Sequence, residues 1–180
     1  YIAERIKEGL QIHTKWECDC SKFQELDGFK LTENQCKTSQ YMCENNIVLL
    51  VGYGGSGKSS STQAFVNMLN AYNKRHLLLA PTGRAAKVLS GFTNENAMTI
   101  HRGLMYMPPA DWGFNEENKL PYDVVIVDEF SMVDIFLFRK LLEAIDFEKT
   151  KLLLIGDDAQ IPSVGAGNVL YDLLKCEDIP

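Results

Sequence analysis

The residues of this sequence with the clearest capacity for chemistry form a glycine-rich stretch that ends in a lysine and a serine. Residues 52–59 read G-Y-G-G-S-G-K-S and fit the pattern G-x-x-x-x-G-K-[ST]. Glycines allow consecutive backbone N–H groups to turn toward an anion, and a following helix adds the positive end of its dipole. The pattern therefore predicts a phosphate-binding loop. In such a loop Lys58 reaches the β- and γ-phosphates of a nucleotide, and the Ser59 hydroxyl binds Mg²⁺.

The surroundings of this loop distinguish it from a chance glycine-rich turn. An apolar run at 47–51 precedes it and a helical pattern at 58–72 follows it, as phosphate binding at a helix N-terminus requires. The residues expected to contact the nucleotide are Gly52, Gly54, Gly55, Ser56, Gly57, Lys58, Ser59 and Ser60.

Two adjacent acids, Asp128 and Glu129, follow the apolar run 124–127. At the end of a strand, one such acid can hold Mg²⁺ through a water and the other can orient and deprotonate a water that attacks the γ-phosphate. We assign the first role to Asp128 and the second to Glu129. The alternative is the ordinary preference of acids for a helix N-terminus, and the phosphate loop upstream argues against it. A glutamate at this position favours hydrolysis over transfer of the phosphoryl group to another substrate.

A third polar stretch, G-D-D-A-Q at residues 156–160, follows another apolar run. Gln160 could donate a hydrogen bond to the γ-phosphate and would then join Lys58 and Glu129 as a catalytic residue. Taken alone, a loop glutamine is more often solvated surface.

Four short apolar runs, at 47–51, 76–80, 124–127 and 152–155, define the expected elements. Each is followed by a polar loop and a helix-forming segment. Because runs without polar alternation are buried on both faces, we expect an α/β fold with a parallel sheet and helices on both faces. Ligands bind such sheets at the carboxyl ends of the strands, which is where the three polar stretches lie.

The segments outside these runs are less regular. Residues 1–45 are expected to be helical, because Ile2, Ile6 and Leu10 recur at helical spacing and Thr32 can cap a second helix. Residues 107–121 carry no clear helix or strand pattern and are expected to form an excursion or small hairpin. We expect residues 1–30 to be a short helical segment at the end of an upstream domain and residues 31–180 to be the ATP-binding domain.

Composition limits the classes of partner. The net charge of −6 argues against attraction to nucleic acid over the whole surface, so binding to DNA would need a local groove. No apolar run approaches the ~20 residues that span a bilayer, and no export signal is present, so we expect a cytoplasmic protein without a membrane partner. The chain starts at Tyr1 and stops at Pro180 just after a motif, which indicates an excised part of a longer protein.

The cysteines are expected to be reduced thiols, because their number is odd and no export signal is present. Zinc binding by the first four is disfavoured, because their spacing does not match the usual ligand spacing. The cysteines are Cys18, Cys20, Cys36, Cys43 and Cys176.

Six stretches, in this order, resemble the RecD/TraA branch of superfamily 1B DNA helicases, which move 5′ to 3′ on single-stranded DNA. The most specific are A-P-T-G-R-A-A-K and G-D-D-A-Q-I-P-S-V-G. The stretches are residues 31–35, 52–59, 80–87, 99–102, 128–134 and 156–165. The resemblance implies a P-loop NTPase fold with a RecA-like sheet.

The resemblance also implies roles for individual residues. Gln35 would read the adenine ring, Gln160 would couple the γ-phosphate to loops that contact DNA, and the 107–121 excursion would act as a pin at the DNA fork. The residues implied to lie near DNA are Pro81, Thr82, Arg84, Thr99, His101 and Arg102. The alternatives are ordinary surface arginines for Arg84 and Arg102 and a hydrogen-bonded helix residue for His101.

The implied function is ATP-dependent DNA unwinding, with ATP and Mg²⁺ as cofactors. The implied partners are single-stranded DNA or a DNA fork, and subunits of a recombination or repair complex such as the exodeoxyribonuclease V to which RecD-like α subunits belong. The family carries its arginine fingers in a second RecA-like domain, which residues 1–180 do not contain, so the isolated chain is expected to be nearly inactive. Tyr53, Gly54, Phe130 and Ile161 depart from the family pattern without removing a functional group.

Two other functions remain open at this stage. A P-loop switch ATPase that is not coupled to DNA would share the phosphate loop, Asp128 and Glu129 but would leave the other family stretches without a purpose. DNA-stimulated hydrolysis distinguishes the two. A degenerate nucleotide-binding or DNA-docking module is disfavoured, because Lys58 and Ser59 are also intact.

Overall fold

The centre of the protein is a parallel sheet. The computed structural model describes residues 1–157, 159 and 167–180, and within these residues the sheet has five strands. Their order across the sheet is β3 (Ile47–Val51), β9 (Lys151–Gly156), β8 (Val124–Val127), β4 (His76–Ala80) and β5 (Ala97–Thr99). The four predicted strands are confirmed. The short edge strand β5 was not predicted, because it has no apolar run to mark it.

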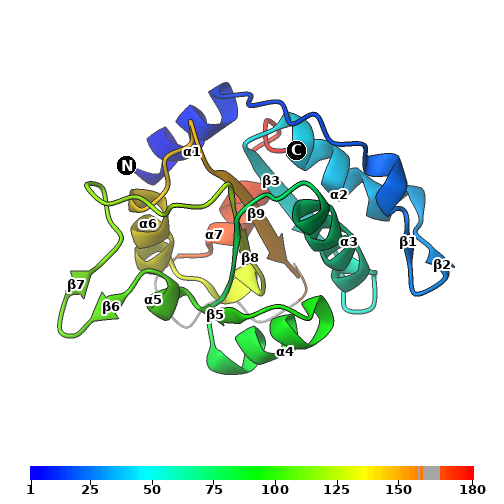
Figure 1. Cartoon of the computed structure of the whole chain (residues 1–180). Coiled ribbons are helices and arrows are strands. Elements are labelled where there is room, and N and C mark those ends of the chain that lie inside the picture. The colour runs from blue at the N-terminus through cyan, green and yellow to red at the C-terminus, as the bar shows by residue number, and fades with distance from the viewer. Residues whose placement is uncertain (158, 160–166) are drawn as a thin grey trace.

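Helices cover both faces of the sheet, as predicted (Figure 1). Successive side chains of a strand point to opposite faces, so β8 directs Val125 and Val127 to one face and Val124 and Ile126 to the other. The first face packs against α1 (Ile2–Gln11), α5 (Ile100–Gly103), α6 (Ile135–Glu143) and α7 (Val169–Leu174). The second packs against α2 (Glu33–Glu44), α3 (Lys58–Ala71) and α4 (Gly83–Thr93).

The prediction of helix throughout residues 1–45 is wrong between α1 and α2. This segment contains a short 3₁₀ turn, η1 (Cys20–Phe23), and a hairpin of β1 (Glu25–Leu26) and β2 (Phe29–Lys30). The hairpin turns at Asp27 and Gly28, whose φ values of 49° and 83° lie in the left-handed region. An Asp-Gly pair is a strong hairpin signal, and the helical spacing of Ile2, Ile6 and Leu10 does not extend to it. The predicted cap is confirmed, because the Thr32 hydroxyl accepts a hydrogen bond from the backbone of Gln35.

A buried lysine, Lys151, fixes the N-terminal segment at the edge of the sheet where the strands begin. The Lys151 side chain is 1% exposed, and its ammonium donates to the carbonyls of Thr14 and Asn45, the second at 3.1 Å. The ring of Trp16 lies between two cations, with the Nζ atoms of Lys74 and Lys151 each 4.8 Å from its centroid. Residues 14–16 therefore pack as part of this domain.

The predicted excursion is a hairpin. Strands β6 (Tyr106–Met107) and β7 (Asp111–Trp112) pair antiparallel and project away from the sheet beyond α5 (Figure 1). In the described part of the chain, no helix has both the length and the apolar character needed to cross a membrane.

The first prediction concerns Lys151. Burial lowers the pKa of Lys151 from its ordinary value of 10.5 to about 8. Between these values the unfolded chain binds more protons than the folded chain, so this residue makes the folded state more stable as the pH rises from about 8 toward 10.5. Replacement of Lys151 by Met should remove this contribution to the slope of unfolding free energy against pH, measured by urea denaturation.

The matched control is Lys149→Met, because the Lys149 side chain is 81% exposed and only two residues away. The control should keep the wild-type slope. Equal slopes for all three proteins would contradict the proposed cost of burying Lys151.

Candidate nucleotide-binding site

The phosphate loop connects β3 to α3, and its last glycine approaches α2 closely. Gly57 precedes Lys58 with a φ of 87°, in the left-handed region. A Cβ atom at Gly57 would lie 2.0 Å from the Nε2 atom of Gln35, so a larger residue would displace this amide from the loop. The left-handed backbone conformation is what favours glycine at the position.

The two predicted phosphate and metal residues of the loop lie at the N-terminus of α3. The Nζ atom of Lys58 donates to the carbonyl oxygens of Gly52 and Tyr53, the second at 3.0 Å. Ser59 lines the same cavity as Lys58, whereas Ser60 faces a neighbouring cavity beside Gln35. The structure thus separates these adjacent serines, as consecutive helix positions point in different directions.

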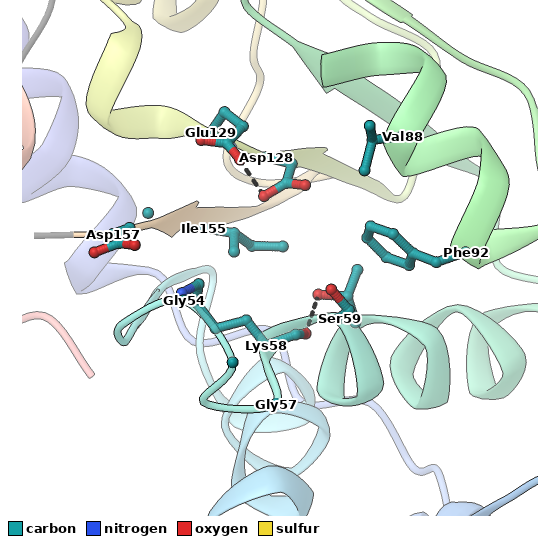
Figure 2. A pocket seen from close by; sticks show the side chains of 13 residues that line it. Gly54, Gly57, Lys58, Ser59, Val88, Phe92, Asp128, Glu129, Ile155 and Asp157 are labelled. Atoms are coloured by element: carbon teal, nitrogen blue, oxygen red, sulfur yellow. Dashed lines mark hydrogen bonds between the residues drawn. The ribbon is translucent and has the colours of Figure 1, made fainter. Parts of the chain in front are cut away.

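A cavity of about 350 Å³ lies at the C-terminal edge of the sheet, over the phosphate loop. Figure 2 shows Lys58 and Ser59 on one side of it and Asp128, from the end of β8, on the other. Because β9 lies between β3 and β8, its end supplies Ile155 and Asp157 to the same cavity. The strand order brings together groups that are about 70 residues apart in the sequence.

Asp128 is a partly buried carboxylate whose environment disfavours its charge. Burial raises the pKa of Asp128 to about 6, against an ordinary value of 3.8. The negative charge of Glu129 raises this pKa further, whereas the Glu129 backbone N–H, which donates to Oδ1 at 2.8 Å, and the Lys58 cation both lower it. A nearby divalent cation would relieve the cost of ionising this group.

Glu129 has a backbone conformation that is uncommon for a side-chain-bearing residue. Its φ is 52° and its ψ is 40°, in the left-handed region. Such conformations cost roughly 1–3 kcal/mol and occur preferentially at functional sites. Here the turn allows the next residue, Phe130, to enter the core, where its ring packs 5.0 Å from that of Phe138, while Glu129 stays at the cavity.

Gln35 connects the start of α2 to the phosphate loop. Its Oε1 atom accepts a hydrogen bond from the Thr32 backbone at 2.8 Å, and its Nε2 atom donates to the Gly57 carbonyl at 3.5 Å. A second cavity, of about 360 Å³, lies beside Gln35 and is also lined by Phe29, Ser60 and Gln63. This cavity is open on the side of Phe29, whose side chain is 78% exposed.

Two apolar residues of the first cavity were not predicted from the sequence. Val88 and Phe92 reach it from α4 and face Ser59 across the opening (Figure 2). Their four-residue spacing places them on one face of the helix, and this spacing was the available signal. They could not be told apart from ordinary core residues without the position of α4.

The residues predicted to lie near DNA occupy the same edge of the sheet, beyond β4 and β5. The hydroxyl of Thr82 accepts from Ala85 N at 3.1 Å and the hydroxyl of Thr99 accepts from Arg102 N at 3.2 Å, so each caps a helix. Pro81 lies between the end of β4 and Thr82, the cap of α4. The other three, Arg84, His101 and Arg102, are exposed.

The predicted contact at Gln160 lies outside the described residues. The last described group at this strand end is Asp157, whose Oδ1 atom accepts from Ala159 N at 2.9 Å. Two of the cysteines that were expected to be reduced thiols are close together, with 3.6 Å between the sulfur atoms of Cys20 and Cys43. Within residues 1–157, 159 and 167–180, no cluster of three or more histidine, cysteine or acidic side chains could hold a metal ion.

Comparison with known proteins assigns a family to this arrangement. A family model described as an AAA domain (AAA_19) matches residues 35–166. Over 145 residues the chain is 37% identical to the ATP-dependent RecD2 DNA helicase of Deinococcus radiodurans, which covers 81% of this chain and 20% of the relative. Over 168 residues it is 32% identical to the RecBCD enzyme subunit RecD of Mycolicibacterium smegmatis, which covers 79% of this chain and 30% of the relative.

A solved structure supports the fold. The Pif1 helicase from Bacteroides, in complex with ADP-AlF3 and single-stranded DNA, matches with a TM-score of 0.54 and 23% sequence identity over 81% of this chain and 37% of that chain. The chain therefore spans between 20% and 37% of the length of these three proteins.

The second prediction follows from the raised pKa of Asp128. With a folded pKa of about 6 and an ordinary value of 3.8, the folded chain binds more protons than the unfolded chain between these values. The stability that Asp128 contributes when protonated is therefore lost as the pH rises through about 6. In the absence of Mg²⁺, Asp128→Asn should raise the unfolding free energy at pH 7 by about 1–3 kcal/mol.

Urea denaturation at pH 7 and at about pH 4 measures this effect, and the difference from wild type should shrink at the lower pH. Asp111→Asn is the control, because it removes a carboxylate charge from an exposed position on β7. An Asp128→Asn protein that is less stable than wild type at pH 7 would contradict the prediction.

Proposed function

The chain belongs to the AAA_19 family of AAA domains, and from this membership we propose that it is the ATP-binding motor domain of a RecD-type DNA helicase. The observation that carries the proposal is the meeting of Lys58, Ser59, Asp128 and Glu129 at one cavity on the C-terminal edge of the sheet. These are the groups that nucleoside triphosphate hydrolysis requires, and they follow two strands, β3 and β8, that only β9 separates in the sheet.

The phosphate loop binds the triphosphate of ATP in this proposal. Backbone N–H groups of residues 54–59 surround the β-phosphate, and α3 directs its N-terminal dipole at it. Lys58 exchanges the carbonyls of Gly52 and Tyr53 for oxygens of the β- and γ-phosphates. The exchange replaces neutral acceptors by charged ones, which form stronger hydrogen bonds with an ammonium group.

Ser59 and Asp128 would hold Mg²⁺. The donor set fits, because hydroxyl and carboxylate oxygens are the ligands that Mg²⁺ prefers and both residues line one cavity. When bound, the ion neutralises charge on the phosphate oxygens. Asp128 is suited to this role because its carboxylate is partly removed from water and gains most from a cation.

Glu129 acts as the general base. It orients a water molecule in line with the γ-phosphate and accepts its proton as the oxygen attacks phosphorus and the bond to the β-phosphate oxygen breaks. The products are ADP and inorganic phosphate. The left-handed backbone at Glu129 keeps this carboxylate at the cavity while Phe130 holds the turn in the core.

DNA binds along the edge formed by the ends of β4 and β5. Arg84 and Arg102 are exposed there and supply the local positive charge that a chain with a net charge of −6 needs for phosphate contacts. Pro81, Thr82 and Thr99 bring the two cationic helices to this edge. The named relatives are DNA helicases or a RecBCD subunit, which supports single-stranded DNA, a DNA fork and recombination or repair subunits as partners.

Movement requires more than this domain. We propose that a second RecA-like domain supplies arginine charge to the γ-phosphate, worth roughly 10³–10⁵ in rate in related NTPases. Closing and opening of the cleft between the two domains then drives 5′-to-3′ translocation, a polarity that rests on the family resemblance. The β6–β7 hairpin lies beside the DNA edge and meets the duplex at the fork.

Replacement of Glu129 by Gln tests the proposed chemistry. In the intact protein, hydrolysis of ATP stimulated by single-stranded DNA should fall by about 10²–10⁴, because the amide cannot accept the proton of the water. Binding of ATP, measured by calorimetry, should persist. Glu117→Gln is the matched control at an exposed turn. Hydrolysis that is indifferent to DNA in the wild-type protein would refute the helicase assignment and favour a switch ATPase.

Gln35→Glu tests recognition of the base. The variant keeps an oxygen that can cap α2 but loses the amide that donates to Gly57 or to a purine nitrogen. Affinity for ATP should fall about twofold to tenfold, the value of one hydrogen bond, whereas affinity for inorganic triphosphate should not change. Gln40→Glu adds the same charge at an exposed position of α2 and is the control. An equal loss for both ligands would show that Gln35 acts only on the phosphate loop.

A further inference from the structure

Three aromatic rings join α5 to the β6–β7 hairpin. The ring of His101, on α5, lies 5.5 Å from that of Tyr106 and 5.5 Å from that of Trp112. Tyr106 and Trp112 face each other across the hairpin with 4.6 Å between ring centroids. His101 therefore contacts one ring from each strand of the hairpin.

The hairpin is short and depends on such contacts. Its two strands are two residues each, with Tyr106 paired to Trp112 and Met107 to Asp111. An isolated hairpin of this size is not stable in water. The backbone pairing of the hairpin continues beyond its two strands, where Phe114 N donates to the carbonyl of Leu104 at 3.1 Å.

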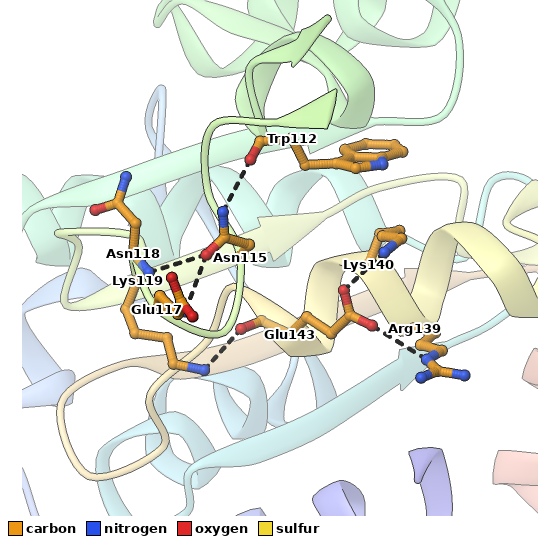
Figure 3. Close-up of polar contacts among 8 residues, drawn as sticks. All are labelled: Trp112, Asn115, Glu117, Asn118, Lys119, Arg139, Lys140 and Glu143. Atoms are coloured by element: carbon orange, nitrogen blue, oxygen red, sulfur yellow. Dashed lines mark hydrogen bonds and ion pairs between the residues drawn. The ribbon is translucent and has the colours of Figure 1, made fainter. Parts of the chain in front are cut away.

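Polar contacts fix the segment that follows the hairpin, residues 115–120, to the body of the domain. Asn115 Nδ2 donates to the carbonyl of Trp112 at 2.9 Å, and Lys119 Nζ donates to the carbonyl of Glu143, at the end of α6, at 2.7 Å (Figure 3). The backbone N–H of Leu120 donates to Ala144 at 2.8 Å. This segment is thus tied to α6, and the side of the hairpin toward α5 is held by the ring of His101.

We propose that His101 is a positioning residue for the hairpin, acting through its ring rather than through a polar contact with DNA. The inference rests on the proposed helicase function. The stack sets the direction of the hairpin relative to α5, which also carries the exposed Arg102. Strand separation at a fork depends on that direction, because the side chains of Met105 and Met107 are 55% and 52% exposed on the hairpin and can pack against base pairs only if correctly aimed.

Because the proposal needs only an aromatic ring at residue 101, two substitutions of His101 should differ in their effect. In the intact protein, His101→Phe keeps a flat aromatic ring and should retain unwinding of a forked duplex. His101→Ala removes the ring and should lower the unwinding rate about tenfold, the effect expected for two aromatic contacts. The proposal gives His101 no polar contact with ATP or with the DNA strand, so hydrolysis of ATP stimulated by single-stranded DNA should stay within about twofold of wild type in both variants.

A spectroscopic measurement reports the position of the hairpin without any activity. Residues 1–180 contain two tryptophans, Trp16 and Trp112, so in this chain a Trp16→Phe background leaves Trp112 as the single tryptophan emitter. Quenching of its emission by acrylamide should increase in His101→Ala and not in His101→Phe. Tyr106→Leu, which removes the other ring that touches His101, should reproduce the His101→Ala result for both quenching and unwinding.

Three outcomes would overturn the proposal. If both His101→Phe and His101→Ala lose DNA-stimulated hydrolysis, the imidazole contacts DNA through its nitrogen atoms. If His101→Ala unwinds forks at the wild-type rate, the stack does not position the hairpin for strand separation. If the wild-type protein is not stimulated by DNA, the helicase function itself fails and the role in strand separation fails with it, while the quenching series still reports whether the stack holds the hairpin.

Discussion

Burial of the central strands on both faces is the constraint on which the other features of this protein depend. Every residue of β8 and β9 is buried, so no polar side chain can be carried along either strand without a cost of desolvation. Chemistry is confined to the strand ends, where Asp128, Glu129 and the buried Asp157 line the cavity. The order β3-β9-β8 then places these carboxylates beside the phosphate loop. The single buried cation among these strands, Lys151, lies at the opposite end and serves packing.

Two features of the site lower the stability of the folded chain. Asp128 is held in surroundings that disfavour its charge, and Glu129 adopts a backbone conformation that favours glycine or asparagine. The core compensates through Phe130, which is fully buried directly after the strained residue. A cation bound beside Asp128, or a proton transferred to it, would interact strongly with this carboxylate, because charges interact more strongly where water is excluded.

The domain also links its two functional regions through short structural connections. Gln35 couples the cap of α2 to Gly57 of the phosphate loop, so these two segments share one side chain. On the other half of the edge, α5 carries both Arg102 and His101, which faces the hairpin rings. A shift of α5 on DNA binding would therefore move the hairpin with it.

The sequence by itself determined the parallel sheet, the phosphate loop, the carboxylates at the strand ends and the cap at Thr32, because these depend on neighbouring residues or on short periodicities. It also determined the family through ordered motifs. The Asp27-Gly28 hairpin was encoded locally as well, but the prediction extended the helical spacing of residues 2–10 across it. What only the tertiary structure decided are contacts between elements, such as Gln35 with Gly57, Lys151 with Thr14, and Val88 and Phe92 at the cavity. The packing of the elements around the sheet determines these contacts, so no local pattern contains them. The stack of His101 with Tyr106 and Trp112 joins residues that are close in the sequence, but it depends on how the β6–β7 hairpin folds against α5. The raised pKa of Asp128 belongs to the same class, because desolvation is a property of the assembled surroundings and not of the residue.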